Sequence, residues 1–355
     1  MQENVSNSYP VEKLTQFAKA MFCATGMEDD KADSLARLMV LTDMMGHRTH
    51  GLALLPPYLD QIEKGLMRKS GSYEVIKDKG STAVWDGDYL PGHWLMEQAL
   101  NESFKRVGQY GVVSIALRRC HHIGCLAAIV KQAADRGLIA MLFNSDPVGK
   151  FVAPYGGTEP LFTPDPFAIG YPTAKSPVLV DISSSITTVS MTRTHYAEGR
   201  QFKNPWLLDG DGKPTTDPAV LEHTDPRGSI QLVGGLEYGH KGFGLVLMNE
   251  ALSQGLSGHG RKDNVTRWGG NVFLQVIDPE WFAGLDEFVA NTDFLAEQCR
   301  HSRPADPAKP VRLPGDQAAK CIEDATQNGV VYGQSTWAAL VQWAEKLGVP
   351  APQAI

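Results

Sequence analysis

From residue 72 onward, short β-rich runs alternate with helical stretches, and this alternation constrains the fold more than any other feature of the sequence. The clearest runs are the strand-like Tyr73 to Ile76, Val112 to Leu117, Leu138 to Phe143, Val178 to Asp181 and Val272 to Ile277, and the helical Trp94 to Val107 and Leu126 to Arg136. Before residue 72, apolar residues recur at helical spacing, and the last part of the chain returns to helix. The sequence therefore predicts an α/β protein flanked by helical segments.

The length of the chain and one unusual span predict how the fold is divided. With 355 residues the chain exceeds one typical domain, so two lobes are expected. Residues 144–225 are rich in Pro, Gly, Thr and Asp, which predicts long ordered loops there rather than regular structure. Loops of that length usually carry a function.

Composition and charge argue against several classes of protein. Lys and Arg number 33 against 40 Asp and Glu, and no run of five like charges occurs, so a nucleic-acid binder is not expected. The longest apolar runs fall far short of the roughly 18 residues of a membrane helix. No secretory signal is readable at the N-terminus, and the five cysteines form no C-x-x-C pair, which favours reduced thiols. We therefore expect a cytoplasmic protein that does not contact a membrane.

No standard phosphate-binding glycine fingerprint is present, because neither G-x-G-x-x-G nor G-x-x-x-x-G-K-[ST] occurs. The nearest approach is residues 234–244, where five glycines surround His240 and Lys241 ahead of an expected apolar helix, Leu245 to Leu256. Backbone amides and a cation at a helix N-terminus would form an anion site. The alternative is a glycine-rich turn with an exposed lysine, and the local sequence leaves both open.

A first histidine cluster lies in a glycine-bounded turn after a helix, where His47, Arg48, Thr49 and His50 stand between Gly46 and Gly51. Histidine can hold or release a proton near neutral pH, arginine can clamp a carboxylate, and a hydroxyl can orient a neighbouring imidazole. The cluster is thus chemically capable of catalysis. The alternative is a polar connection whose side chains face water.

A second cluster, Cys120 to Gly124, lies at the end of a predicted strand, where α/β proteins commonly place ligand sites. It contains His121 and His122, one of which is expected to be structural. Adjacent histidines on a strand point to opposite faces, and no H-E-x-x-H or H-x-x-E-H spacing occurs, so no metal site is expected. G-x-S-x-G is also absent, and the serine run 183–185 is read more easily as a strand end or helix cap.

Seven stretches in a fixed order point to one family. They are Gly46 to Gly51 with the following Leu54 to Tyr58, His122 to Gly124, Gly156 to Phe162, Asp181 to Ser185, Asp211 to Pro218, His240 to Leu245 and Leu313 to Asp316. Together they resemble the malate/L-lactate dehydrogenase family that lacks a Rossmann fold. This family includes sulfolactate and ureidoglycolate dehydrogenases, 2,3-diketogulonate reductase and a piperideine-2-carboxylate reductase.

The resemblance implies an oxidoreductase that uses NAD or NADP and usually forms a homodimer. Its α/β fold would have two lobes, a discontinuous helical lobe and a three-layer α/β/α lobe with a mixed sheet, which accounts for the missing glycine fingerprint. Residues 1–75 would pack with residues 280–355 in the helical lobe. Residues 76–279 would form the lobe that binds cofactor and substrate.

The same resemblance assigns site residues. The family's catalytic histidine falls on His50, the hydroxyl before it on Thr49, and the grouped acidic residue on Asp181. Cofactor contacts fall on Ile182, Ser183, Ser184, Ser185, Ile186, Thr187, His240, Lys241, Pro314, Gly315 and Asp316. His122 matches a family histidine beside the nicotinamide pocket and is expected to contact both substrate and cofactor. Arg48 or Lys241 is expected to face the carboxylate of a small substrate or the cofactor phosphates.

Hydride transfer to or from a carbinol carbon requires a base for the hydroxyl proton, and in reverse an acid. His50 suits that role, and Asp181 would orient its imidazole and stabilise the cationic form. The chain departs from the family pattern at Met44 to Gly46, at Arg48 and at residues 163–166, all expected near the substrate cleft. These departures are compatible with the chemistry and leave the substrate open. The resemblance implies a 2-hydroxy acid of the malate or lactate kind; a cyclic imino acid substrate, or a non-catalytic ligand-binding or dimerisation role, are the alternatives.

Overall fold

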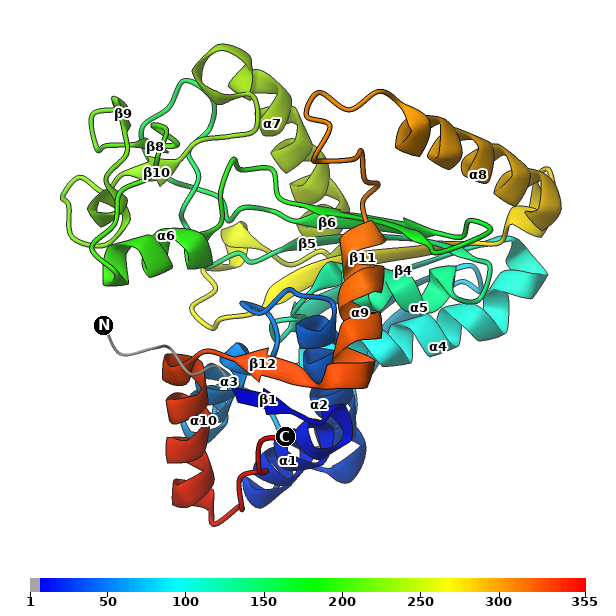
Figure 1. Ribbon diagram of the computed structural model, residues 1–355, viewed down its shortest axis with the longest axis horizontal. Helices are drawn as coiled ribbons and strands as arrows, with labels where there is room; N and C mark the ends of the chain where they lie inside the picture. Colours follow the sequence, from blue (N-terminus) through cyan, green and yellow to red (C-terminus); the bar gives the residue numbers. More distant parts are fainter. Residues whose placement is uncertain (1–6) are drawn as a thin grey trace.

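The computed structural model describes residues 7–355, which fold into a helical lobe below a larger lobe built on a seven-stranded sheet (Figure 1). The strands of this sheet, in spatial order, are β2 (Glu74–Asp78), β3 (Thr82–Asp86), β4 (Val112–Cys120), β11 (Gly270–Ile277), β5 (Ile139–Ser145), β6 (Phe167–Tyr171) and β7 (Val178–Ile182). β3 and β4 run parallel, and the other neighbours are antiparallel. The predicted mixed sheet is thus confirmed.

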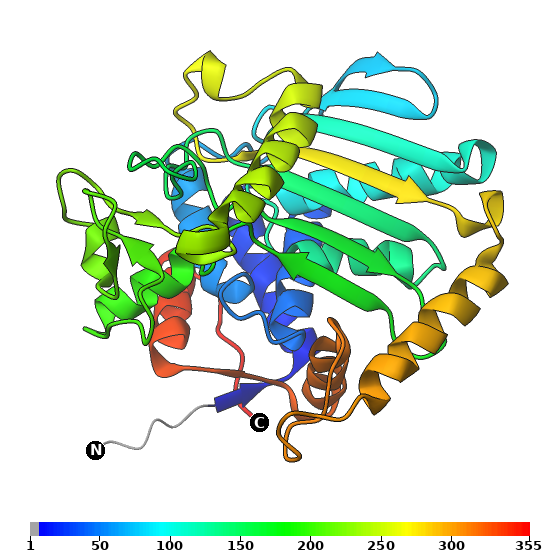
Figure 2. The ribbon, with the colours of Figure 1, turned by 90° about the horizontal axis from the view of Figure 1, so that it is seen from above.

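Helices cover both faces of the sheet. α4 (Gly92–Tyr110) and α5 (Leu126–Ala134) lie on one face, and α7 (Gly235–Glu250), continued by a π-helical turn (Ala251–Gly255), crosses the other, as Figure 2 shows. The alternation along β11 fits this arrangement, because Val272 and Leu274 join the core under α4 and α5 whereas Phe273 packs with Phe143 on the opposite face. The large lobe therefore has the three layers that were predicted.

The helical lobe combines both ends of the described chain. Its elements are α1 (Val11–Ala24), α2 (Asp29–Met44), α3 (Leu55–Glu63), α9 (Asp316–Asn328), α10 (Gln334–Leu347) and the two-stranded sheet of β1 (Asn7–Tyr9) and β12 (Val330–Tyr332). Residues of α1, α2, α3 and α10 share one hydrophobic core, in which Tyr9 stacks on Trp337. α8 (Leu285–His301) lies instead beside the large lobe. There Glu297 of α8 forms an ion pair with Lys175, and the Thr292 hydroxyl of α8 donates a hydrogen bond to the Pro172 carbonyl. The chain thus returns to the helical lobe only at α9.

Two expectations from the sequence are wrong. Besides β7, which the sequence predicted, residues 144–225 contain the strand β6, α6 (Val189–Ala197) and part of a small sheet formed by β8 (Leu207–Leu208), β9 (Pro214–Thr215) and β10 (Ser229–Ile230). In addition, the helix expected from Leu245 begins ten residues earlier, at Gly235. Its glycines serve close packing, since a Cβ at Gly242 would lie 2.7 Å from the Val233 backbone and one at Gly239 would lie 2.9 Å from the Tyr155 ring.

None of the helices in residues 7–355 combines the length and the apolar character that crossing a bilayer requires.

Candidate active site

The His47 to Gly51 turn is built around a buried carboxylate, that of Asp43. Asp43 is 2% exposed, and it accepts hydrogen bonds from the Leu52 N–H (2.8 Å) and the Tyr332 hydroxyl (2.6 Å). A Cβ at Gly51 would lie 2.0 Å from Oδ1 of Asp43, so only glycine fits there. Burial raises the pKa of Asp43 to about 6, although its two hydrogen bonds and the charge of Arg48 oppose this rise. Asp43 therefore holds the turn in place.

His50 stands at the edge of this turn and is half-buried. Its Nδ1 lies 3.0 Å from the Thr49 hydroxyl. Burial lowers the pKa of His50, and the negative charge of Asp181 partly offsets that effect. The imidazole is consequently neutral near physiological pH, while a carboxylate close by favours its protonation. Arg48, in the same turn, is exposed, and its charge acts on Asp43.

His122 lies next to His50, with ring centroids 6.1 Å apart and planes inclined by 24°. It follows the end of β4, and its Nδ1 lies 2.6 Å from the buried Tyr58 hydroxyl. Gly92 makes this turn possible, because a Cβ there would lie 2.3 Å from the carbonyl oxygen of His121 and 2.5 Å from that of His122. His121 points into the interior and is fully buried, so its role is structural.

The carboxylate of Asp181 lies near the N-terminus of α5. Its Oδ2 accepts a hydrogen bond from the Ala127 N–H (2.8 Å), and the Cys125 thiol lies 3.6 Å away. A helix N-terminus stabilises a carboxylate in this position. Within residues 7–355, Asp181 makes no hydrogen bond with His50. Thr49 therefore contacts the ring, and Asp181 acts on it through its charge.

The serine run after β7 is rigidly held. Ser184 donates its N–H to the Pro164 carbonyl (2.8 Å) and its hydroxyl to the Asp165 carbonyl (3.1 Å), and the Ile186 N–H bonds the Gln231 carbonyl (2.9 Å). Ser183 and Ser185 are tied to each other, and Ser185 donates to the Thr187 carbonyl. Ile182, by contrast, exposes 46% of its surface.

α7 brings His240 and Lys241 next to this serine run. A Cβ at Gly242 would lie 2.9 Å from the Ser184 carbonyl oxygen, so the helix packs directly on the run. Both His240 and Lys241 are exposed, and Nζ of Lys241 lies 5.2 Å from the centroid of the Tyr238 ring. Since α7 begins at Gly235, Lys241 sits in its second turn and not ahead of a helix N-terminus, as the sequence had suggested.

Pro314 to Asp316 lie on the other side of β7. The Leu179 N–H donates to the Pro314 carbonyl (3.0 Å), and Gly315 caps α9 with a φ of 102°. The carboxylate of Asp316 accepts from Arg300 (2.8 Å) and from the Leu313 N–H (2.8 Å). The structure thus brings Pro314 and Gly315 beside β7, while the Asp316 carboxylate is engaged by Arg300 and by the Leu313 N–H of the turn before α9.

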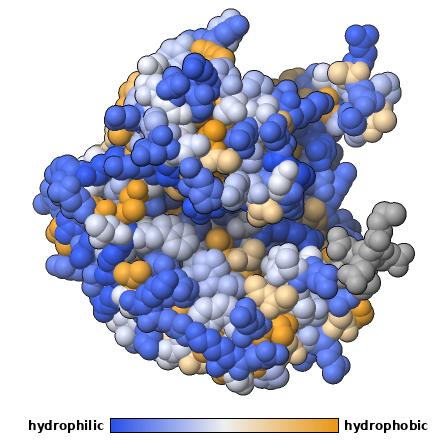
Figure 3. All heavy atoms as spheres, turned by 90° about the vertical axis from the view of Figure 1, so that its left-hand side faces the viewer, coloured by the Kyte–Doolittle hydropathy of each residue, from blue (hydrophilic) through white to orange (hydrophobic). Residues whose placement is uncertain are grey.

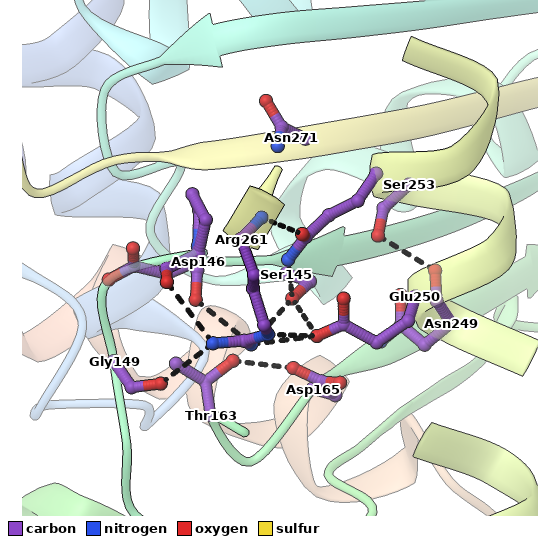
Figure 4. A network of polar contacts seen from close by, with 12 residues as sticks. Ser145, Asp146, Gly149, Thr163, Asp165, Asn249, Glu250, Ser253, Arg261 and Asn271 are labelled. Atoms are coloured by element: carbon purple, nitrogen blue, oxygen red, sulfur yellow. Dashed lines mark hydrogen bonds and ion pairs between the residues drawn. The ribbon is translucent and has the colours of Figure 1, made fainter. Parts of the chain in front are cut away.

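A polar cluster around Arg261, Glu250 and Asp165, drawn in Figure 4, is joined to the serine run by the hydrogen bond from the Ser184 hydroxyl to the Asp165 carbonyl. Arg261 pairs with Glu250 (2.7 Å) and also donates to backbone carbonyls of residues 146–149. Asp165 is fully buried next to them, and its pKa is raised well above the ordinary value by burial and by the charge of Glu250. We expected residues 163–166 near the substrate cleft, but the structure places Asp165 in this interior cluster, where it fixes the turn that binds Ser184.

The arrangement around Ser183 to Thr187 suits a nicotinamide dinucleotide. Exposed Lys241 offers a cation for phosphates, the half-buried Ser183 offers a polar contact, and Ile182 offers an apolar surface for a ring, whereas Ser184 and Ser185 are buried and shape the run. Within residues 7–355, no group of three His, Cys, Asp or Glu side chains could hold a metal ion. Seen from the side of α6 and α10, the surface is hollowed between the two lobes (Figure 3).

Sequence reasoning missed three neighbours of this site, namely Asp43, His93 and Trp268. Trp268 lies 5.0 Å from His122 between ring centroids, and His93 packs against Tyr58. From the sequence, Tyr58 was named only as the last residue of a stretch that resembles the family, Leu54 to Tyr58. A signal for His93 was its place directly after Gly92 at a helix start, whereas nothing in the sequence marked Trp268.

Known proteins match this chain over nearly its whole length. Residues 9–341 match the family model described as malate/L-lactate dehydrogenase. Hydroxycarboxylate dehydrogenase B of Escherichia coli K12 is 28% identical over 349 residues, covering 96% of this chain and 95% of the relative. Malate dehydrogenase of Pyrococcus horikoshii has a TM-score of 0.87 at 25% identity, covering 99% and 98% of the two chains. Δ1-piperideine-2-carboxylate reductase of Pseudomonas syringae has a TM-score of 0.83 at 25% identity, covering 95% and 99%.

Proposed function

The chain belongs to the malate/L-lactate dehydrogenase family, and from this premise we propose that it transfers a hydride between NAD or NADP and a small 2-hydroxy acid, with His50 as acid/base. Its relatives are named as dehydrogenases of hydroxy acids, and the chain is accordingly an oxidoreductase acting on a CH–OH group. The observation that carries the proposal is the half-buried imidazole of His50, held by Thr49, influenced by Asp181 and placed beside His122.

His50 takes the hydroxyl proton of the substrate in the oxidation and returns it in the reduction. Its Nδ1 faces Thr49, so Nε2 is the nitrogen that exchanges the proton. For this exchange, Nδ1 carries a hydrogen and donates it to the Thr49 oxygen. The charge of Asp181 then stabilises the imidazolium that forms. When bound, the nicotinamide supplies the hydride acceptor or donor.

The remaining site residues are assigned to binding. Ile182 to Thr187, His240, Lys241, Pro314 and Gly315 would hold the cofactor, with Lys241 facing its phosphates. Arg48, exposed beside His50, would bind the substrate carboxylate. Asp316 would support this set indirectly, since its carboxylate holds the turn of residues 313–316 by accepting from the Leu313 N–H.

We further propose a homodimer located in the cytoplasm. α7 exposes 54% of Leu236, 50% of Leu247 and 40% of Met248 on its outer surface, which a second copy would cover. All five cysteines are free, in keeping with a reducing compartment.

A second candidate is the reduction of a cyclic imino acid. It is supported by the structural likeness to the piperideine-2-carboxylate reductase and by Arg48, which departs from the family pattern beside the candidate cleft. A cyclic imino acid also carries a carboxylate for Arg48 and also needs a proton donor at its nitrogen. The two candidates therefore share the site and differ in the substrate atom that His50 serves.

A screen of 2-oxo acids and cyclic imines with NADH and NADPH tests these proposals. Positioned proton transfer contributes about 10²- to 10⁴-fold, so His50→Ala should lower kcat by about that factor with little change in the dissociation constant of the cofactor. His47→Ala is the matched control, because His47 is exposed in the same turn. Near wild-type turnover in His50→Ala would place the acid/base elsewhere. Absence of turnover with every substrate would favour a ligand-binding protein that kept the fold.

A further inference from the structure

Tyr58 lies at the centre of a group of imidazole and indole rings beneath the candidate active site. It is 0% exposed, and its ring centroid lies 5.9 Å from that of His93, 5.6 Å from that of His121 and 5.8 Å from that of Trp268. Within residues 7–355, its hydroxyl makes one hydrogen bond, to Nδ1 of His122 at 2.6 Å.

Two donors converge on that nitrogen. The Gly124 N–H lies 3.3 Å from Nδ1 of His122, and a backbone amide can only donate. Nδ1 therefore offers a lone pair and carries no proton. The Tyr58 hydroxyl must then donate to it as well. Because burial raises the pKa of Tyr58 well above its ordinary value, that hydroxyl keeps its proton. A neutral imidazole without a proton on Nδ1 carries it on Nε2.

The surroundings also disfavour a charged His122. An imidazolium would set its own N–H against the Gly124 N–H. Burial lowers the pKa of His122 well below its ordinary value, and His50, His93 and His121 lower it further. Burial also lowers the pKa of His93 and of His121 to about 3, so both are neutral near physiological pH.

The other nitrogen of His122 is free to act. All four nitrogens of His93 and His121 are buried without a partner, whereas Nε2 of His122 is accessible and makes no hydrogen bond within residues 7–355. We propose that Tyr58 fixes His122 as a neutral imidazole protonated on Nε2, which makes His122 a permanent hydrogen-bond donor to the substrate oxygen beside His50. The identity of the acceptor rests on the proposed function, while the position of the proton does not.

Such a donor serves the reaction because negative charge develops on the substrate oxygen during reduction. A preorganised N–H aimed at that oxygen stabilises the charge without rearrangement. Since the donor never gives up its proton, it does not compete with His50. Tyr58 is thus a positioning residue, which acts through His122.

Nuclear magnetic resonance of protein labelled with ¹⁵N- and ¹³C-histidine tests the position of the proton, without substrate or cofactor. The signals of His122 are identified by their loss in His122→Gln. We expect wild-type His122 to keep its proton on Nε2 from about pH 6 to about pH 9. Tyr58→Phe removes one of the two donors and should give a mixture of tautomers that begins to titrate. Tyr73→Phe, whose ring stacks on Trp85, is the control and should leave His122 unchanged.

Kinetics test the role of the donor. Loss of one ordinary hydrogen bond corresponds to about a 5- to 10-fold change, so Tyr58→Phe should lower kcat by about that factor and add a second ionisation to the acidic limb of the pH profile. His122→Gln keeps an N–H donor and should retain more activity than His122→Ala.

Several results would overturn the inference. A wild-type His122 that carries its proton on Nδ1, or that titrates near the ordinary pKa, contradicts the proposed tautomer. An unchanged spectrum in Tyr58→Phe removes Tyr58 from its positioning role, and equal activity of His122→Gln and His122→Ala removes the donor. Absence of any turnover would refute the proposed function, and the spectra would still decide the tautomer.

Discussion

Replacing Asp43 by asparagine should make the stability of the protein depend less on pH. The buried carboxyl of Asp43 has its pKa raised from 3.8 to about 6, so the fold disfavours its ionised form. Below the unfolded pKa the carboxyl is protonated in both states and costs nothing. As the pH rises from about 4 to about 6, the unfolded chain ionises first and the fold loses stability, and above that range the loss is complete. The asparagine side chain of the variant would not titrate.

The size of the effect follows from the shift in pKa. Slightly more than two pKa units correspond to about 3 kcal/mol at about 1.36 kcal/mol per unit, of which about 2 kcal/mol falls between pH 4.5 and pH 7.5. The entropy of unfolding of a chain of this length is about 0.75 kcal/mol per kelvin. The Tm of Asp43→Asn minus the Tm of wild type should therefore be about 2 to 3 °C larger at about pH 7.5 than at about pH 4.5. Any constant cost of the substitution cancels in this difference.

Thermal unfolding of both proteins at matched concentration, since Tm of an oligomer depends on concentration, provides the assay. Asp60→Asn is the control, because Asp60 lies on the surface of α3 and pairs with Lys64. A surface pair of this kind is worth well under about 1 kcal/mol. If the difference in Tm between wild type and Asp43→Asn is the same at both pH values, Asp43 ionises normally and burial does not control it.

Three further predictions concern cofactor, turn and assembly. Lys241→Met should raise the cofactor dissociation constant about tenfold or more, as expected for a charge-assisted contact, and unchanged affinity in fluorescence titrations would make Lys241 a solvated surface residue. Gly92→Ala should lower Tm because its Cβ would meet two carbonyl oxygens, whereas Gly108→Ala in the same helix has open space and should be neutral or stabilising; equal effects would contradict this. Light scattering should give a dimer of 2 × 38.7 = 77.4 kDa, and a monomer at micromolar concentration would refute the proposed assembly.

The sequence predicted those elements whose pattern is local. The predicted strand Val112 to Leu117 is β4, and the predicted helix Trp94 to Val107 is α4 with a few residues added at each end. These segments carry enough apolar residues at the right period to reveal their structure. The family resemblance, and with it the three-layer fold, is confirmed by the match over residues 9–341.

The start of α7 was missed for a tertiary reason. A run of glycines indicates a loop when judged from the local sequence. Here, however, glycine is required because the Tyr155 ring packs against α7 at Gly239 and the Ser184 backbone packs against it at Gly242. Likewise, β6 lies in a span that Pro and Gly mark as loop, and its pairing with β5 and β7 decides its structure. No local pattern reports such contacts. The domain boundaries at residues 75 and 280 stay a prediction.

The candidate site could be predicted in part from the sequence, because its histidines lie in short motifs with other polar residues. His50 and His122 belong to stretches far apart in sequence, and the fold sets their rings side by side. The residues that decide how each behaves were not readable. Asp43 reaches the His50 turn from within α2, and Tyr58 reaches His122 from α3. Their effects depend on burial and on single hydrogen bonds, which a one-dimensional pattern does not encode.

The difference between the two histidines gives the strongest reason for their separate roles. A group that exchanges protons during turnover must be able to adopt both its neutral and its protonated form. His50 meets this condition, because the charge of Asp181 opposes the lowering of its pKa by burial. A group that donates a hydrogen bond throughout turnover must keep one protonation state. The Tyr58 hydroxyl and the Gly124 N–H, both on Nδ1, keep His122 in the neutral form with its proton on Nε2. Reversing the roles would require His122 to accept a proton against the Gly124 amide. The environment of each ring, and not its place in a motif, is therefore what supports our proposal that His50 is the acid/base.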